Sequence, residues 1–556
     1  MRFSTSTAAS LLALLQSTNA SKGSTYQDWR LLAEAGPITD TMPVGPSSLS
    51  TRDISPAEKN TEWIDLPLDH FGTNAGTFRN RFWVNSKTYK PGGPVFIFDA
   101  GETDAAAWYE YILFKNNSYF WHFMNDFDGL GILWEHRFYG QSTPLIDRKV
   151  NITVDTPPEA FEFFTTEQAL EDFVTFAKQF SRKDIDYKLT PDHTPWVWVG
   201  GSYPGMRGAW LREKHPEIIF ASYSTSSPVQ VTVDTSFFWD IIREGMITKG
   251  FGNCTRDIQA AIRHIDKVLD SGESAATALK EQFLGLGAGN STSASFGEVL
   301  SLIYYQWTFN SVEGGKWGLR YFCDWLETDP ETNKLAPEAG WAATKGDKWA
   351  SDRWAAYPNL TAIVNDNWDL SCSGSLNKTG DCNLDLPFTS ASSIAWGWQY
   401  CTEMGGLQPA NLGPTQMVSK YNSFQHQKDI CKRQFPTAPA RLLPDLPKCD
   451  KIIEKLGGWT IRPSNVYWTN GDMDFRRQLS PGSDLPEAPK VEITQEIPKC
   501  GVSTGESKVF GKVLRNAVHG YDQTMGAYDN VPDIPVTQEL FHQALREWLP
   551  CFHAKQ

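Results

Sequence analysis

The sequence predicts an α/β fold whose mostly parallel sheet is interrupted by a long, largely helical insertion. Two observations indicate this fold. Short apolar runs alternate with segments of helical periodicity in the first part of the chain, and strand-like runs return near its end after a helical middle. Buried strands that alternate with helices are typical of a parallel sheet covered by helices on both faces.

The individual elements follow from apolar runs and from periodicity. Runs of three to five mostly apolar residues predict buried strands at residues 94–98, 131–134, 196–199, 465–469 and 508–510. Apolar residues at helical spacing predict helices at residues 166–180, 257–269, 296–307 and 537–549. We therefore assign residues 21–225 and 451–556 to the sheet domain and about 226–450 to the helical insertion.

Residues 1–20 have the features of a secretory signal peptide. Arg2 precedes an apolar run at residues 8–15, and small residues at positions 18–20 offer a cleavage site. No later apolar stretch is long enough to span a membrane. We expect an exported protein, secreted or delivered to a vacuole or lysosome.

Sequons and cysteines agree with export. Six N-x-S/T sequons are candidate glycan sites, at Asn116, Asn151, Asn253, Asn290, Asn359 and Asn377. The nine cysteines have no metal-ligand spacing, so we expect disulfides and neither a metal nor a cofactor. Four bridges would leave one thiol free, and sequence suggests only the local pair Cys372–Cys382.

Charge and aromatic content bear on the partner. A net charge of −14 excludes nucleic acid as the expected partner, because phosphate binding needs a basic surface. The 22 tryptophans are either core residues or the lining of a pocket for apolar or ring-shaped groups. The sequence gives no sign of the oligomeric state.

The strand at 196–199 ends in Gly200-Gly201-Ser202, and a helical segment follows. Such a strand–turn–helix exposes a serine hydroxyl beside the positive end of a helix, which favours a developing oxyanion. The N–H of Tyr203 would be the first oxyanion donor. The pattern departs from G-x-S-x-G, since the glycine stands at Gly205 and Pro204 takes its place.

A serine nucleophile needs a base, and the base needs an orienting carboxylate. Loops after the last two predicted strands supply Asp472, Asp474 and His519, in the order Ser, Asp, His of α/β-hydrolases. Periodicity does not choose between the two aspartates. The charged run 135–137 after a strand is interpreted as a buried ion-pair and hydrogen-bond group that supports the site.

Four motifs resemble signatures of the prolyl serine peptidases, the family of lysosomal Pro-X carboxypeptidase, dipeptidyl peptidase II and fungal prolyl endoproteases. The motifs lie at residues 135–142, 166–170, 200–203 and 470–474, and the resemblance runs from about Leu66 to the C-terminus. It implies an α/β-hydrolase fold with a large, mainly helical inserted cap that limits substrate size.

The resemblance also implies roles for single residues. Ser202 would be the nucleophile, Asp474 rather than Asp472 the orienting carboxylate, and His519 the general base. The loop at Gly101-Glu102 would complete the oxyanion hole, with Glu102 as second donor. Met206 matches a position that lines the pocket for the residue before the cleaved bond.

This chain also departs from the family pattern. Where the family has Pro-Trp after its aspartate, with the tryptophan in a wall of the proline pocket, this chain has Phe475-Arg476. Phe475 and Arg476 are therefore candidate substrate-binding residues, and Arg476 would suit a substrate carboxylate.

We expect a secreted serine peptidase that acts on peptides or proteins through an acyl-enzyme, with some preference for proline before the cleaved bond. The sequence leaves exopeptidase and endopeptidase open. A carboxylesterase or lipase of the same fold and a catalytically silent binding glycoprotein are the alternatives, because the fold does not determine the chemistry.

Overall fold

The computed structural model describes residues 55–553, with gaps at 73–74, 146–150, 314, 316–317, 369, 375–381 and 524–530. The expected signal peptide and the sequon at Asn377 lie outside the described residues. None of the described helices is both long enough and apolar enough to cross a membrane.

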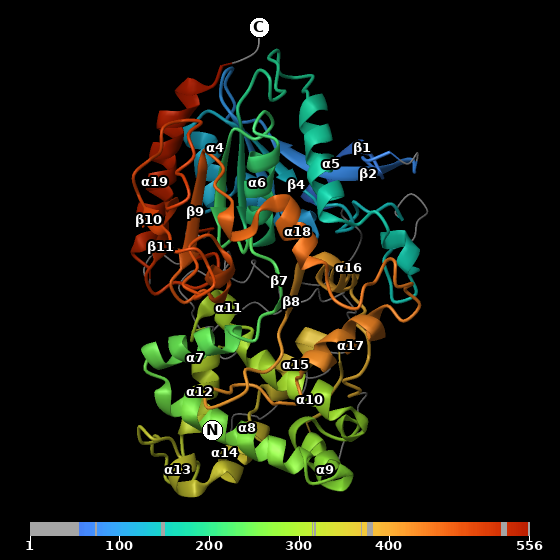
Figure 1. Ribbon diagram of the computed structural model, residues 1–556, viewed down its shortest axis with the longest axis vertical. Helices are drawn as coiled ribbons and strands as arrows, with labels where there is room; N and C mark the ends of the chain where they lie inside the picture. Colours follow the sequence, from blue (N-terminus) through green and yellow to red (C-terminus); the bar gives the residue numbers. More distant parts are fainter. Residues whose placement is uncertain are drawn as a thin grey trace, which may run out of the picture.

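A mixed sheet forms the centre of the upper half of the molecule (Figure 1). Its strands, within the described residues, are β1 (Glu62–Pro67), β2 (Thr77–Asn85), β3 (Val95–Asp99), β4 (Leu130–Trp134), β5 (Trp196–Gly201), β6 (Ala221–Thr225), β9 (Val466–Gly471), β10 (Glu492–Thr494) and β11 (Lys508–Leu514). They lie in the order β1-β2-β4-β3-β5-β6-β9-β11-β10. β2 is antiparallel to β1 and β4, and the other neighbours pair in parallel. This is the sheet of the α/β-hydrolase fold.

Helices cover both faces of this sheet because its central strands are apolar on both sides. β3, for example, sends Val95 and Ile97 to one face and Phe96 and Phe98 to the other. One face is covered by α5 (Thr166–Gln179), α6 (Tyr203–Lys214) and α18 (Cys449–Leu456). The other is covered by α3 (Tyr109–Phe114), α4 (Tyr119–Asp126) and α19 (Asp533–Trp548), while the short α2 (Pro56–Lys59) lies beside α3.

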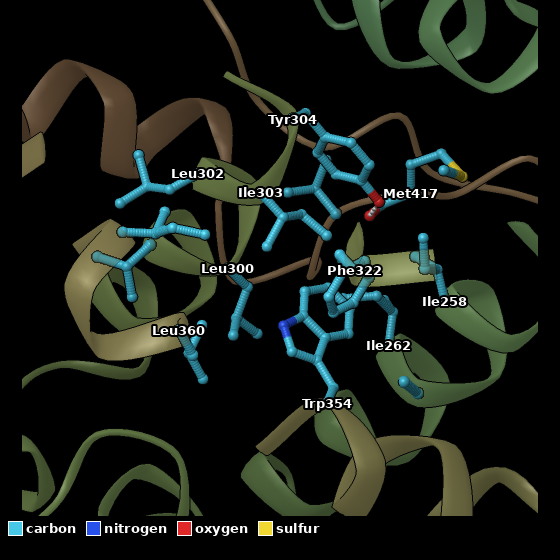
Figure 2. Close-up of a cluster of buried hydrophobic side chains, with 14 of the residues drawn as sticks. Ile258, Ile262, Leu300, Leu302, Ile303, Tyr304, Phe322, Trp354, Leu360 and Met417 are labelled. Carbon is cyan, nitrogen blue, oxygen red and sulfur yellow. Dashed lines mark hydrogen bonds between the residues drawn. The ribbon is translucent and has the colours of Figure 1, made fainter. Parts of the chain in front are cut away.

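Apart from α18, which lies on the sheet, the chain between β6 and β9 is mainly helical and makes up the lower half of the molecule (Figure 1). Its helices are α7 (Phe238–Thr248), α8 (Gly252–Leu269), α9 (Glu273–Leu284), α10 (Ser293–Val299), α11 (Trp307–Asn310), α12 (Leu319–Glu327), α13 (Ala342–Lys345), α14 (Asp347–Ala355), α15 (Leu360–Trp368), α16 (Ala391–Gln399) and α17 (Phe424–Gln434). Figure 2 shows their core, in which Trp354 of α14 packs against Phe322 of α12. Two short parallel strands, β7 (Thr232–Asp234) and β8 (Gly405–Leu407), join near the sheet domain. The insertion therefore has a large hydrophobic core, which also takes in Met473, Phe475, Leu479 and Val518 from the loops after β9 and β11.

Disulfides fasten both parts of the chain. The pairs are Cys254–Cys323, Cys372–Cys382, Cys401–Cys431 and Cys500–Cys551. Cys449 keeps a free, buried thiol, and all nine cysteines lie in the described part of the chain. The expected local pair and the expected single free thiol are thus confirmed.

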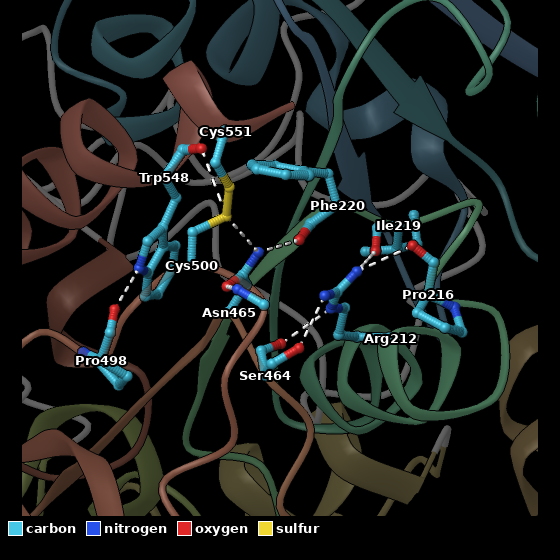
Figure 3. The surroundings of a disulfide bond; sticks show 11 residues. Arg212, Pro216, Ile219, Phe220, Ser464, Asn465, Pro498, Cys500, Trp548 and Cys551 are labelled. Carbon is cyan, nitrogen blue, oxygen red and sulfur yellow. Dashed lines mark hydrogen bonds between the residues drawn. A yellow bond between two sulfur atoms is a disulfide. The ribbon is translucent and has the colours of Figure 1, made fainter. Parts of the chain in front are cut away.

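The Cys500–Cys551 bridge lies at the amino ends of β6 and β9 (Figure 3). Asn465 Nδ2 donates to the carbonyl of Phe220 at 3.0 Å, which joins the residues just before these strands. The Arg212 guanidinium of α6 satisfies carbonyl oxygens of the same turns. This edge is closed by structural contacts, so the opposite, carboxyl edge remains for a functional site.

The predicted strands are confirmed as β3, β4, β5, β9 and β11, and the helices at 166–180, 257–269 and 537–549 as α5, α8 and α19. The helix predicted at 296–307 is wrong in extent, because α10 gives way to a 3₁₀ helix at Leu300–Tyr304 before α11. Sequence analysis missed β1, β2, β6 and β10. β6 reads Ala-Ser-Tyr-Ser-Thr, and its short polar side chains are buried without an apolar run.

Candidate active site

The predicted site residues follow strands that are neighbours in the sheet. Ser202 follows β5, Asp474 lies three residues beyond β9, and His519 lies five residues beyond β11. β5, β6, β9 and β11 are consecutive and parallel, so these loops share the carboxyl edge of the sheet. Ligand sites of open α/β sheets lie at this edge.

Ser202 has a strained backbone. Its φ is 59° and its ψ is −129°, a region that non-glycine residues rarely occupy. Its N–H donates to the carbonyl of Thr225 at 2.9 Å, and its own carbonyl accepts from Met206 N at 3.0 Å. Because these bonds fix both sides of the residue, the neighbouring chain holds the strained turn.

This turn needs glycine at Gly205 as well as at Gly200, where a Cβ would come within 2.7 Å of the carbonyl carbon of Pro204. A Cβ at Gly205 would come within 2.0 Å of Ser227 Oγ and 2.8 Å of the carbonyl of Gly200. Pro204 sits in the first turn of α6, where a helix leaves its N–H groups unpaired. The departure from G-x-S-x-G therefore keeps the close approach that the turn needs.

Asp474 and His519 are brought into contact. His519 Nδ1 lies 3.0 Å from Asp474 Oδ2, and both residues are at most 2% exposed. Burial alone would raise the pKa of Asp474, but the charge of His519 and hydrogen bonds from His519, the Arg476 N–H and Ser226 outweigh it. The pKa lies below its ordinary value. The carboxylate is thus held ionised beside the imidazole.

Asp472, the rival carboxylate, lies elsewhere. It is exposed, and its Oδ1 accepts a hydrogen bond from the main-chain N–H of Ala517 at 3.2 Å. It joins the loop after β9 to the loop that carries His519. Of the two aspartates, only Asp474 contacts the imidazole in the described structure.

Two sets of contacts that sequence analysis missed fix these loops. Ser226, directly after β6, accepts a hydrogen bond from Gly520 N at 2.9 Å and bonds Asp474. From α11 of the insertion, the carbonyl of Thr308 accepts from His519 N at 3.1 Å. Neither contact had a signal in the sequence, because β6 has no apolar run and nothing in the sequence places α11 beside the site.

The loop after β3 lies against the nucleophile turn. Gly101 has φ +64°, and a Cβ there would come within 2.5 Å of Pro204 Cγ. The buried Asp99–Arg207 ion pair (2.6 Å) holds the loop, with Asp99 Oδ1 accepting from Gly101 N at 3.1 Å. Glu102 follows Gly101 in this loop. Burial raises the pKa of Glu102 to about 7, although the charge of Arg476 opposes this shift.

A cavity of about 190 Å³ opens at Ser202 between the sheet domain and the insertion. Ser202, Tyr203, Met206 and Arg476 line it from the sheet domain. The insertion adds aromatic walls, among them Phe238, Trp239, Tyr305, Trp368, Phe388, Trp396 and Tyr400. Phe475 lies behind this wall, because it is 5% exposed and its ring packs against Phe238 with centroids 4.4 Å apart.

The charged run after β4 forms the expected buried group. Glu135 pairs with Arg81, with Arg81 Nε 2.6 Å from Glu135 Oε2, and Arg137 pairs with Asp172 at 2.6 Å. His136, between these two residues, has its Nε2 3.0 Å from the hydroxyl of Tyr203. In the described part of the chain, no three His, Cys, Asp or Glu side chains gather as metal ligands.

Comparisons with known proteins agree with this geometry. Residues 66–488 match the family described as serine carboxypeptidase S28. A probable extracellular serine carboxypeptidase of Arthroderma benhamiae is 27% identical over 515 residues, covering 87% of this chain and 65% of that protein, just under two thirds of its length. The thymus-specific serine protease of Homo sapiens is 23% identical, covering 88% and 86%. The lysosomal Pro-X carboxypeptidase of Bos taurus is 22% identical, covering 92% of each.

Proposed function

Because this chain belongs to the serine carboxypeptidase S28 family of peptidases, we propose that it hydrolyses peptide bonds with Ser202 as nucleophile. His519 takes the hydroxyl proton and later gives it to the leaving amine, while Asp474 holds the imidazole. The 3.0 Å contact between His519 Nδ1 and Asp474 Oδ2 carries this proposal. In our proposal the ring proton of His519 is on Nδ1, where it is donated to Asp474, so Nε2 is unprotonated and accepts the proton of Ser202.

Attack produces a tetrahedral intermediate whose oxygen is negative. In our proposal the main-chain N–H of Tyr203, at the start of α6, donates to it, and the N–H of Glu102 is the second donor. The contact between Gly101 and Pro204 supports this, because it brings the two loops together. Collapse of the intermediate leaves an acyl-enzyme, which water hydrolyses through the same base.

The cavity indicates which part of a substrate is recognised. Met206 and the aromatic walls suit an apolar or proline side chain before the cleaved bond. Arg476 lines the same cavity as Ser202, so its guanidinium is the group we assign to a substrate's C-terminal carboxylate. This assignment favours a carboxypeptidase over an endopeptidase.

A peptide library tests the proposal. The purified protein is incubated at mildly acidic pH with proteome-derived peptides, and each cleavage is identified by mass spectrometry, with Ser202→Ala as control. Loss of single C-terminal residues, mainly after proline, is the expected result. Internal cuts would indicate an endopeptidase, and hydrolysis of short acyl esters without any peptide cleavage would refute the peptidase and indicate an esterase.

We also propose that the protein is exported. The disulfides favour an oxidising compartment, and the sequons at Asn116, Asn151 and Asn290 are on exposed residues. Recovery from the culture medium with a mass that falls on deglycosylation is the expected result. Retention inside the cell without glycans would contradict it.

A further inference from the structure

Four buried side chains beside Ser202 form one chain of hydrogen bonds. The Tyr139 hydroxyl donates to Gln399 Oε1 at 2.7 Å, and Gln399 Nε2 donates to the Tyr203 hydroxyl at 3.0 Å. His136 Nε2 lies 3.0 Å from that hydroxyl, and its Nδ1 lies 2.7 Å from the carbonyl oxygen of Arg137. Each of the four is at most 2% exposed. We call this chain the Tyr203 clamp.

The chemistry of the partners assigns a direction to every bond. A carbonyl oxygen only accepts, so His136 Nδ1 carries a proton. Burial and the charge of Arg207 lower the pKa of His136 well below its ordinary value, so the ring is neutral and Nε2 is an acceptor. The Tyr203 hydroxyl therefore donates to His136 and accepts from Gln399. Turning the Gln399 amide over would place the Tyr203 hydroxyl between two acceptors, Gln399 Oε1 and His136 Nε2, and its single proton could bond only one of them.

The clamp joins three separate parts of the chain. His136 and Tyr139 lie in the turn after β4, Tyr203 is the first residue of α6, and Gln399 is the last residue of α16 in the insertion. Only Gln399 comes from the insertion, and it makes two of the four bonds. The insertion is thus bonded directly to the residue that follows the nucleophile.

The helix that carries Gln399 also walls the cavity. Trp396 of this helix lines the cavity that opens at Ser202. So does Tyr400, the first residue of the π-helical turn Tyr400–Met404 that follows the helix. Such π turns often mark functional sites. Within the turn, Glu403 Oε2 accepts from Thr166 N at 2.7 Å, which fixes the segment to α5. A substrate that contacts this wall contacts the element that holds Tyr203.

Tyr203 supplies the main-chain N–H that, in the proposed function, binds the oxyanion, and this inference rests on that function. Ser202 before it is strained, and strained turns persist only when their surroundings determine them. We propose that Gln399, Tyr139 and His136 are positioning residues that act through the Tyr203 hydroxyl to align its N–H with the oxyanion, so that catalysis depends on docking of the insertion.

Tyr203→Phe and Gln399→Met test the clamp, since neither removes the N–H and both keep the bulk of the side chain. The readouts are the second-order rate constant for labelling of Ser202 by a fluorophosphonate, and kcat and KM for a short peptide, per folded molecule. We expect each variant to lower the labelling rate constant and kcat about tenfold, with KM within about twofold. The double variant should lose no more than the worse single variant, because either change breaks the same chain.

Tyr304→Phe is the matched control. Its buried hydroxyl donates to the carbonyl of Met417 at 3.1 Å in the core of the insertion (Figure 2). This variant should lose stability but keep the labelling rate constant. The loss of labelling rate constant in the Tyr203 and Gln399 variants should also be the same across a range of about pH 5 to 8. Burial holds the pKa of His136 well below its ordinary value, so the ring stays neutral over this range.

The outcomes separate the two proposals. Three results would overturn the clamp. The first is a Tyr203→Phe variant that keeps the labelling rate constant, as Tyr304→Phe is expected to do. The others are a change in KM alone in the Tyr203 and Gln399 variants, and fully additive losses in the double variant. Labelling of Ser202 without cleavage of any peptide would overturn the peptidase, and the labelling rates of the variants would still decide the clamp. A wild-type protein that fluorophosphonate does not label would overturn both.

Discussion

Replacing Asp474 with Asn is expected to lower kcat about 10⁴-fold, by reversing the imidazole tautomer. Asp474 Oδ1 accepts from the Arg476 N–H at 2.9 Å, while Oδ2 faces His519 Nδ1 at 3.0 Å. An asparagine that keeps its carbonyl oxygen on the Arg476 N–H turns its NH₂ toward His519. Nδ1 must then give up its proton, which moves to Nε2.

With the proton on Nε2, His519 cannot accept the hydroxyl proton of Ser202. The opposite amide orientation sets the NH₂ against the Arg476 N–H in a site that is 1% exposed, and an unmade buried hydrogen bond costs about 1–3 kcal/mol. Either orientation also removes the charge that stabilises the imidazolium. A 10⁴-fold loss corresponds to about 5.5 kcal/mol of transition-state stabilisation.

Asp472→Asn is the matched control for this experiment. Its exposed side chain accepts from Ala517 N at 3.2 Å, and an asparagine oxygen can accept the same bond. We expect kcat within about twofold of the wild type. Both variants are assayed as kcat on one peptide per folded molecule, with circular dichroism as the folding check. If Asp474→Asn kept more than a tenth of the activity, or if Asp472→Asn lost as much, the assignment would be refuted.

Two further predictions concern charge. Arg476→Ala should reduce cleavage of free-carboxylate peptides at least about tenfold relative to amidated ones. The control is Arg477→Ala, which should leave this ratio unchanged because the Arg477 guanidinium pairs with Asp484. If Arg476→Ala had the same ratio as the wild type, the carboxylate role of Arg476 would be refuted. Burial and the neighbouring Asp257 raise the pKa of Glu327 from 4.5 to about 9, so the folded state binds the extra proton between these values. Wild-type stability relative to Glu327→Gln should then fall as pH rises from about 4.5 toward 9, by at most about 1.4 kcal/mol per pH unit. Unfolding by urea at several pH values measures this, and a difference that grows toward alkaline pH in favour of the wild type would contradict it.

Local patterns in the sequence were enough for the strands on which the site is built. β3, β4, β5 and β9 are buried on both faces, so their apolar runs are visible without any partner. β1 and β2 are less uniform, since each is partly exposed in an antiparallel pair at the edge of the sheet. Their alternating pattern is weaker and was missed.

The choice between the two aspartates shows where sequence reasoning ended. Asp472 and Asp474 stand in the same loop, two residues apart, and only the family resemblance favoured Asp474. In the structure the loop turns so that Asp474 is buried against His519, while Asp472 is exposed and bonds Ala517. Which of two neighbouring side chains points inward depends on the turn, and the turn is set by contacts with β11 and α11.

The sequence by itself determined the fold class, the order of a serine, an aspartate and a histidine at Ser202, Asp472 or Asp474, and His519, and the presence of a helical insertion. Strand burial, helical periodicity and motif order are local properties of the chain. Tertiary structure alone decided which residues meet. Thr308 and Gln399 are 106 and 197 residues from Ser202 in the chain, and the aromatic walls of the cavity begin 36 residues away, at Phe238. They reach the site only because the insertion folds back onto the carboxyl edge of the sheet. No local pattern encodes such contacts, since they depend on how the insertion packs against the loops after β9 and β11.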